Sequence, residues 1–244
     1  MAKIEALSPT THRGLGINIQ AHQAQFQGAV MLTPTEIIEA QREYPILFRK
    51  HPETGRLFPN ALLGLTEHEN LFIDENGHWQ AHYTPLAVQK GPFLIGFKNE
   101  AGQSKAIISI DIENTCIDTN TNDYRIEESA IESLFEADNS ASDYLNRVND
   151  ALLALHQGMQ QLDAMIDAFM QAQLIEPITI DIELNNGETF VFAGAYSIAE
   201  EKLKALSAEQ LLMLNQQGYL HLAYCISQSV ANIGKLVNIK NQQK

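Results

Sequence analysis

Cysteine is nearly absent from this chain of 244 residues, which contains only Cys116 and Cys225. Two cysteines are too few for a disulfide framework or for a cysteine-based zinc site. The residues around each thiol contain nothing that predicts a lowered thiol pKa. We therefore expect both cysteines to be buried and chemically inert.

Basic residues are also scarce, because 16 lysines and arginines stand against 30 aspartates and glutamates. The formal charge is therefore −14, and the sequence contains no compact cluster of basic residues. Such a chain repels phosphate backbones, which excludes nucleic acid as an expected partner.

Long apolar runs are missing as well, and no stretch reaches the roughly 18 apolar residues of a membrane span. The first residues have no apolar segment and include Glu5, so we expect no cleaved secretory signal. The default location is the cytoplasm, and the alternative is the cell surface, reached by an export route that reads no such signal. Catalytic and nucleotide-binding signatures are missing too, so the sequence predicts no cofactor and does not favour an enzyme.

What is present is a hydrophobic content of 45%, which is ample for a buried core. The first half contains short apolar segments bounded by Gly, Pro or Asn, and such segments predict strands. Thr33 and Glu36 form a capping box that opens a short helix ending at Tyr44, before Pro45. The predicted strands lie at residues 29–32, 46–48, 61–63, 71–73, 79–83, 93–95 and 106–111.

Residues 111–143 are strongly acidic, with ten aspartates and glutamates against the single basic residue Arg125. We interpret this segment as a solvated linker with a short helix near residues 127–135.

The second half is predicted to be helical with one inserted hairpin. Eight apolar residues spaced three and four apart predict one long core helix, and they lack the flanking charges of a coiled coil. These residues are Leu145, Val148, Leu152, Leu155, Met159, Leu162, Ile166 and Phe169. The alternating residues 178–184 then turn at Asn186-Gly187 into residues 190–192, with the long helix as the expected partner of their apolar face.

Two more capping boxes, Ser197 to Glu200 and Ser207 to Gln210, predict short helices, and Gly218 ends the second of them. A final helix is predicted at residues 219–237. The fold class is therefore α+β, with a mostly-β N-terminal half packed on a helical C-terminal half that contains one hairpin. We predict a single domain over residues 1–244, with possible subdomains at 1–140 and 141–244.

The densest group of chemically interesting side chains is His78, Trp79, His82 and Tyr83. An aromatic residue that combines apolar area with a polar edge suits a ligand surface, so these four residues are the candidate ligand-binding site. Two histidines four apart share a face and could also hold a metal, but the sequence identifies no third ligand. The alternative for Trp79 is an ordinary place in the core.

Several segments occur in an order that resembles the bacterial SapC-like proteins, over residues 12–236. These segments are Tyr44-Pro-Ile-Leu-Phe48, Ala61-Leu-Leu-Gly-Leu65, Glu69-Asn-Leu-Phe72, Gly77-His-Trp79, Tyr83-Thr-Pro85, Gly91-Pro-Phe93, Leu134-Phe135 and the helix that follows Gly218. The family name comes from proteins associated with a paracrystalline surface layer. The resemblance implies an accessory role in nutrient uptake or modification, and it carries over no catalytic residue.

From these observations we expect a soluble, non-enzymatic accessory or binding protein. Its partner would be an unidentified protein or a small molecule such as a glycan or a peptide. The alternatives are a structural component of a surface layer and an enzyme of unrecognised type with a metal at His78 and His82.

Overall fold

The computed structural model describes residues 2–100, 103–118 and 130–243. Helices make up 39% and strands 27% of the chain, and the antiparallel sheets lie mostly in the N-terminal half, so the fold is α+β as predicted. The chain forms two compact units. Unit 1 comprises Met1–Gln25, Glu75–Trp79 and Leu86–Leu155, and unit 2 comprises Phe26–Asp74, Gln80–Pro85 and His156–Lys244. Each unit is built from three separate stretches of chain, and the single domain remains a prediction.

Unit 1 contains short helices and two small sheets, together with the first part of the long helix α5 (Asp143–Gln171). Its other elements are β1 (Ile4–Ala6), α1 (Pro9–His12), β2 (Gly16–Asn18), α2 (Ile19–Gln23), α4 (Leu86–Gln89), β6 (Phe93–Glu100), β7 (Gln103–Asp111), β8 (Ile117–Asp118) and β9 (Ile131–Ser133).

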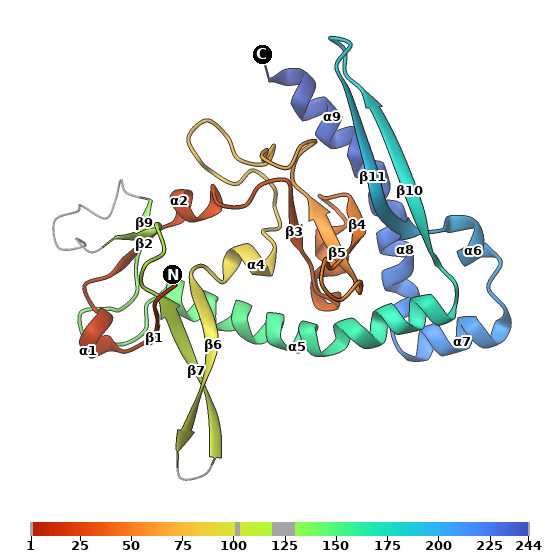
Figure 1. The fold of residues 1–244 in the computed structure, drawn as a ribbon. Helices are drawn as coiled ribbons and strands as arrows, with labels where there is room; N and C mark the ends of the chain where they lie inside the picture. The colour runs from red at the N-terminus through yellow and green to blue at the C-terminus, as the bar shows by residue number, and fades with distance from the viewer. Residues whose placement is uncertain (1, 101–102, 119–129, 244) are drawn as a thin grey trace. The chain divides into compact units, whose positions relative to one another are not determined.

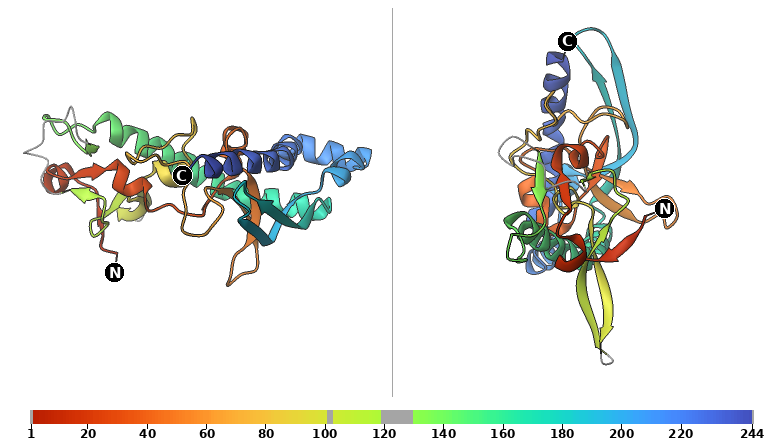
Figure 2. Two further views of the ribbon diagram at one scale, coloured as in Figure 1. Left: turned by 90° about the horizontal axis from the view of Figure 1, so that it is seen from above. Right: turned by 90° about the vertical axis from the view of Figure 1, so that its left-hand side faces the viewer.

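The sheets of unit 1 are antiparallel and have the strand orders β1-β7-β6 and β8-β2-β9. β6 and β7 pair as far as Glu100 and Gln103, and together they project as a two-stranded arm (Figure 1, Figure 2). This hairpin is longer than predicted, because pairing continues beyond the predicted strands at residues 93–95 and 106–111.

The core of unit 1 forms where α5 packs on these strands. Its buried members are Ile17, Phe93, Ile110, Cys116, Leu134, Tyr144, Leu145, Val148 and Leu152. Cys116 is buried as predicted, and burial raises the pKa of its thiol to about 11. Cys225 of unit 2 is buried as well, and burial raises its thiol pKa too.

Unit 2 is formed around one five-stranded sheet and contains the remainder of α5. Its other elements are β3 (Ala29–Met31), η1 (Pro34–Glu36), α3 (Ile37–Ala40), β4 (Ile46–Lys50), β5 (Leu57–Leu62), β10 (Ile175–Glu183), β11 (Thr189–Ile198), α6 (Glu200–Lys204), α7 (Ala208–Gln216), α8 (Tyr219–Ser229), η3 (Val230–Asn232) and α9 (Ile233–Gln242).

The sheet has the antiparallel order β10-β11-β4-β5-β3. The predicted hairpin is confirmed as β10–β11, and Gly187 adopts φ +84° in its turn, a conformation that glycine tolerates best. Its main packing partner is α8 rather than the expected long helix, and the hairpin also runs beside α9 (Figure 1). The Asn185 N–H donates to Asn241 Oδ1 at 2.9 Å and ties the turn to that helix.

The long helix is confirmed, but its apolar stripe is interrupted. Six of the eight predicted residues are buried, whereas Leu155 is half-buried and Met159 is 44% exposed. The interruption falls where unit 1 ends at Leu155 and unit 2 begins at His156. α5 therefore contributes to two cores rather than to one continuous seam. No helix among the described residues has the length and apolar character needed to cross a membrane.

Three predicted strands or helices are wrong. Residues 71–73 and 79–83 form no continuous strand: Ile73 and Trp79 are single β-bridge positions, and the Gln80 N–H donates to the Phe72 carbonyl at 2.7 Å. Asn70 Oδ1 accepts the Phe72 N–H at 2.9 Å and bends the chain before Ile73. Of the predicted helix near residues 127–135, the described part contains β9, which pairs with β2. Residues 119–129 lie outside the described part of the chain.

The capping predictions have mixed outcomes. The boxes at Thr33 and Ser207 are confirmed. Ser197, however, lies inside β11 opposite Glu176, and the following helix begins after Ala199 without a side-chain cap.

The predicted last helix is divided into α8, η3 and α9. Ser229 Oγ donates to the Ile226 carbonyl and accepts the Ile46 N–H, so it bonds across to β4 at the break.

Candidate functional site

The four predicted site residues fall in both units. His78 and Trp79 belong to unit 1, whereas His82 and Tyr83 belong to unit 2. His78 is exposed with its Nε2 3.2 Å from Gln20 Nε2, and Trp79 is half-buried. His82 is exposed. Within the described residues, no three side chains of His, Cys, Asp and Glu are grouped as a metal ion would require.

Tyr83 is the most constrained of the four residues. Its hydroxyl donates to Glu36 Oε2 at 3.0 Å, and its carbonyl accepts the Tyr44 hydroxyl. Burial raises the pKa of the Tyr83 phenol above its usual value, and the neighbouring Glu36 carboxylate raises it further. The polar tip predicted to face a ligand therefore faces a buried carboxylate.

Glu36 is only 2% exposed, and its other oxygen closes the predicted capping box. Oε1 accepts the Thr33 N–H at 2.8 Å and the Thr33 hydroxyl at 3.0 Å. A buried carboxylate needs such donors to offset its lost hydration. The network fastens the segment that carries Tyr83 to the start of η1.

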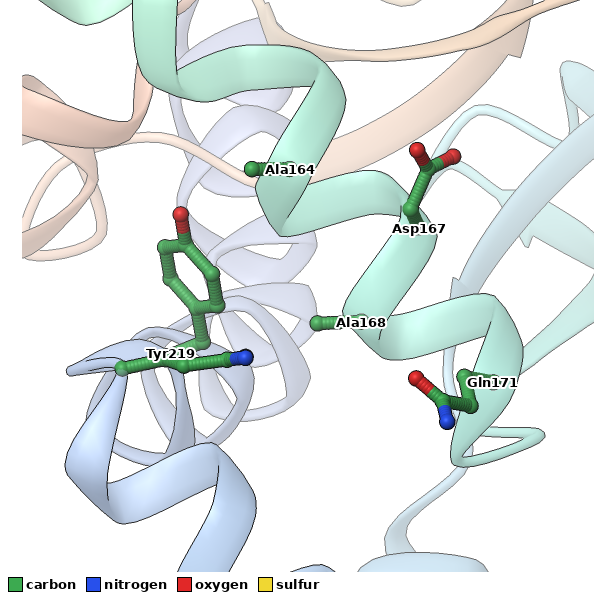
Figure 3. Close-up of a pocket in the computed structure, with 6 residues that line it drawn as sticks. Ala164, Asp167, Ala168, Gln171 and Tyr219 are labelled. Carbon is green, nitrogen blue, oxygen red and sulfur yellow. The ribbon is translucent and has the colours of Figure 1, made fainter.

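A surface pocket of about 260 Å³ lies in unit 2 between α5 and the α7–α8 turn (Figure 3). We call it the Tyr219 pocket. It is lined by Ala164, Asp167, Ala168, Gln171, Gln217 and Tyr219. The four residues from α5 are spaced three and four apart and therefore share one face of the helix. Gly218, with φ +78°, makes the turn that presents Gln217 and Tyr219.

The Tyr219 ring stands against the alanine face of α5, with the side chains of Ala164 and Ala168 pointing toward it (Figure 3). Its other support is Phe169, whose ring lies edge-on at 6.3 Å between centroids. Small side chains on the facing helix leave the ring next to open space, so the pocket combines a rigid aromatic wall with an apolar floor.

The rim of the Tyr219 pocket is polar. Gln171 and Gln217 are exposed carboxamides, each with donor and acceptor atoms. Asp167 points away from Tyr219 (Figure 3), and its Oδ1 lies 3.5 Å from Arg56 Nη2. An aromatic wall with planar hydrogen-bonding groups around it suits a small polyhydroxylated ligand.

The sequence predicted the helix end at Gly218 but not this pocket. Glutamine, alanine and tyrosine carry no motif, and the two walls come from helices that are far apart in sequence. Only the spacing of Ala164, Asp167, Ala168 and Gln171 could have indicated one wall.

The fold and the pocket define an α+β protein with a small polar surface site. The SapC family model matches residues 7–236 of the 244, so the chain belongs to the SapC family. The match confirms the resemblance seen in the ordered segments of the sequence. No curated protein and no solved structure matches this chain.

Proposed function

We propose that this protein is a non-enzymatic accessory protein that binds a carbohydrate in the Tyr219 pocket. The observation that supports the proposal is the joining of an aromatic wall, an alanine floor and two carboxamides within unit 2. A sugar ring has an apolar face that can stack on tyrosine, and hydroxyl groups around its edge that pair with amide groups.

The size of the pocket restricts the ligand. Its volume of about 260 Å³ is just below the usual range of small-molecule sites, which begins near ~300 Å³. A single sugar ring therefore fits better than a long chain, and a dissociation constant of about 1 mM is the expected scale.

The proposal is tested by saturation-transfer NMR and calorimetry with glucose, galactose, N-acetylglucosamine and maltose. We expect saturable binding of at least one sugar, weakened about tenfold or more in Tyr219→Ala and retained in Tyr219→Phe, which keeps the ring. Tyr224→Ala removes another tyrosine of α8 that is 37% exposed, and it should leave binding unchanged.

Tyr219 packs on Phe169, so its truncation also tests stability. Gln171→Ala and Gln217→Ala remove exposed side chains and should weaken binding without changing the melting temperature. Full binding by both glutamine variants, or no binding by any of the sugars up to about 10 mM, would contradict the proposal.

The residues predicted from sequence offer a second place for the same kind of ligand. Trp79 is the only tryptophan, so its emission reports directly on that part of unit 1. A sugar-dependent change in emission, with binding lost in Trp79→Phe and kept in Gln171→Ala, would assign the function to that segment instead.

A further inference from the structure

A second pocket of unit 2, with a volume of about 290 Å³, lies where the five-stranded sheet opens. We call it the Arg49 cleft. The residues that line it come from β4, β5, β11 and the chain after β5, and they include Leu47, Arg49, Lys50, Leu62, Glu67 and Phe192. None of them belongs to the Tyr219 pocket.

The opening arises because β11 pairs with β4 over a much shorter length than it pairs with β10. β11 pairs with β10 from Thr189 to Ile198, but with β4 it is in register only at Tyr196 and Phe48. A bulge interrupts the β10–β11 register, and Gly194 adopts φ +74° there. Bulges bend a strand and increase its twist, which turns the hairpin away from the β4 edge.

The floor of the cleft is apolar and its rim is charged. Leu47 and Leu62 lie beneath the cleft and are each only 1% exposed, so the apolar surface that a ligand can reach is mainly the half-buried ring of Phe192. Arg49 supplies a positive charge and Glu67 supplies a negative charge, whereas the side chain of Lys50 leaves β4 on the opposite face from Arg49.

The basic groups of the cleft differ from others in the described part of the chain. Arg42 and Arg56 bond to carboxylates at 2.9 Å, whereas neither Arg49 nor Lys50 forms an ion pair with a described carboxylate. The Lys50 ammonium instead lies 4.9 Å from the centre of the Tyr196 ring. The Arg49 guanidinium, with its fork of donors, is therefore available to an anion from solution.

The backbone adds a further donor. Alternate residues of an antiparallel strand direct their N–H and C=O groups to the same neighbour. Phe48 pairs with Tyr196 of β11, so Lys50 directs its N–H to the same side, where β11 has already turned away.

We propose that the Arg49 cleft binds a small amphipathic carboxylate, with the carboxylate on Arg49 and the apolar body against the ring of Phe192. Arginine pairs with a carboxylate through two parallel hydrogen bonds, and the ring of Phe192 covers part of the apolar body of the ligand. The ligand is either a free aliphatic acid or the C-terminal residue of a peptide, because both present this chemistry.

Calorimetry at low salt distinguishes these sources with two acids, hexanoate and N-acetyl-leucine, and their neutral controls, hexanamide and N-acetyl-leucinamide. We expect one acid or both to bind and each neutral amide to bind at least tenfold more weakly. The tighter acid identifies the source. Acetate, which lacks the apolar body, should bind at least tenfold more weakly than hexanoate or N-acetyl-leucine.

The assignment to the cleft is tested with Arg49→Gln, which should lower the affinity at least tenfold, and with Arg49→Lys, which should restore part of it. Arg42→Gln removes a 63% exposed arginine side chain of unit 2 and should leave the affinity within twofold. Binding of neither acid, equal binding of acid and amide, equal binding of acetate, or full affinity in Arg49→Gln would each overturn the proposal. Melting temperatures confirm that each variant is folded.

Discussion

Each unit contains a tyrosine whose hydroxyl is shielded from solvent, and the two hydroxyls differ in their hydrogen bonding. In unit 2 the Tyr83 hydroxyl donates to Glu36 at 3.0 Å. In unit 1 the Tyr144 hydroxyl is buried without a hydrogen-bond partner among the described residues, and Tyr144 is only 6% exposed. The Tyr83 hydroxyl holds its segment of chain to Glu36. The Tyr144 hydroxyl makes no such bond and is buried because its ring packs in the unit 1 core.

The surroundings of Tyr144 explain why its buried, unpaired hydroxyl does not prevent folding. Its ring lies 6.4 Å from the Phe93 ring between centroids, and the Arg147 guanidinium lies 5.9 Å from its centre. A side chain added at Gly91 would place its Cβ 2.8 Å from the Tyr144 hydroxyl, so the glycine makes room for the oxygen. Apolar packing of the ring offsets the cost of the unpaired group.

The largest expected effect compares two positions of the long helix. Leu152 is buried in the unit 1 core, whereas Leu155, the last residue of that unit, is half-buried. Leu152→Ala should lower the free energy of unfolding by about 2–5 kcal/mol. Leu155→Ala should cost about 1 kcal/mol, because less apolar surface is lost from a core.

Chemical denaturation of both variants measures this difference, and hydrogen exchange shows which unit is affected. Equal losses for Leu152→Ala and Leu155→Ala would mean that the apolar stripe is continuous, as the sequence predicted. Loss of protection confined to unit 1 in Leu152→Ala would show that the units open separately.

The next effect concerns the two hydroxyls. Tyr83→Phe removes one hydrogen bond to the buried Glu36 carboxylate and should cost about 1–3 kcal/mol. Tyr144→Phe removes a buried hydroxyl that has no partner in the described part of the chain, so stability should stay within about 0.5 kcal/mol or rise. Urea unfolding of both variants compares the two free energies directly.

An equal cost for both phenylalanine variants would remove the distinction between the units. A large cost at Tyr144 would mean that its hydroxyl has a partner in solution, such as an ordered water. Glu36→Gln serves as a control for the Tyr83 contact, since it keeps an acceptor near the phenol and removes the charge.

The same contacts show how far the sequence could predict the site. The capping box at Thr33 and Glu36 is a local pattern, and the hydrogen bonds that it predicts are present in the structure. The second partner of Glu36 is Tyr83, 47 residues later, and no local pattern records that bond. Residues 79–83 were predicted as a strand because they form a short segment between Gly77 and Pro85, and such bounds do not distinguish a strand from a series of bends.

The β10–β11 hairpin could be predicted because its signals are local: alternating apolar residues form the first strand, and Asn186-Gly187 forms the turn. The fold class followed from local patterns of the same kind. The partner of that hairpin was wrong, because an apolar face does not specify which helix covers it. The opening of the sheet at Gly194 was not predicted at all. A glycine in a strand indicates a bulge, but only the single β11–β4 pair shows what the bulge produces.

The smallest effect is a dependence of stability on alkaline pH. Burial raises the phenol pKa of both Tyr83 and Tyr144 above the ordinary value near ~10. The folded protein therefore keeps two protons that the unfolded chain releases above that pH. Stability is unaffected below pH ~10 and falls as the pH rises above it, by at most about 1.4 kcal/mol per pH unit for each tyrosine.

Unfolding in urea at pH 8 and pH 11, compared between the wild type and each phenylalanine variant, isolates these contributions. Cys116 titrates in the same range, since burial raises its thiol pKa to about 11, but it is present in all three proteins and cancels in the comparison. Tyr144→Phe and Tyr83→Phe should each lose less stability than the wild type between the two pH values, by up to about 1 kcal/mol. The benefit should appear in both variants even though only Tyr83→Phe is destabilised at pH 8. If the pH dependence is unchanged in Tyr144→Phe, the hydroxyl is hydrated in solution, and the contrast between the two units lies in water access rather than in hydrogen bonding.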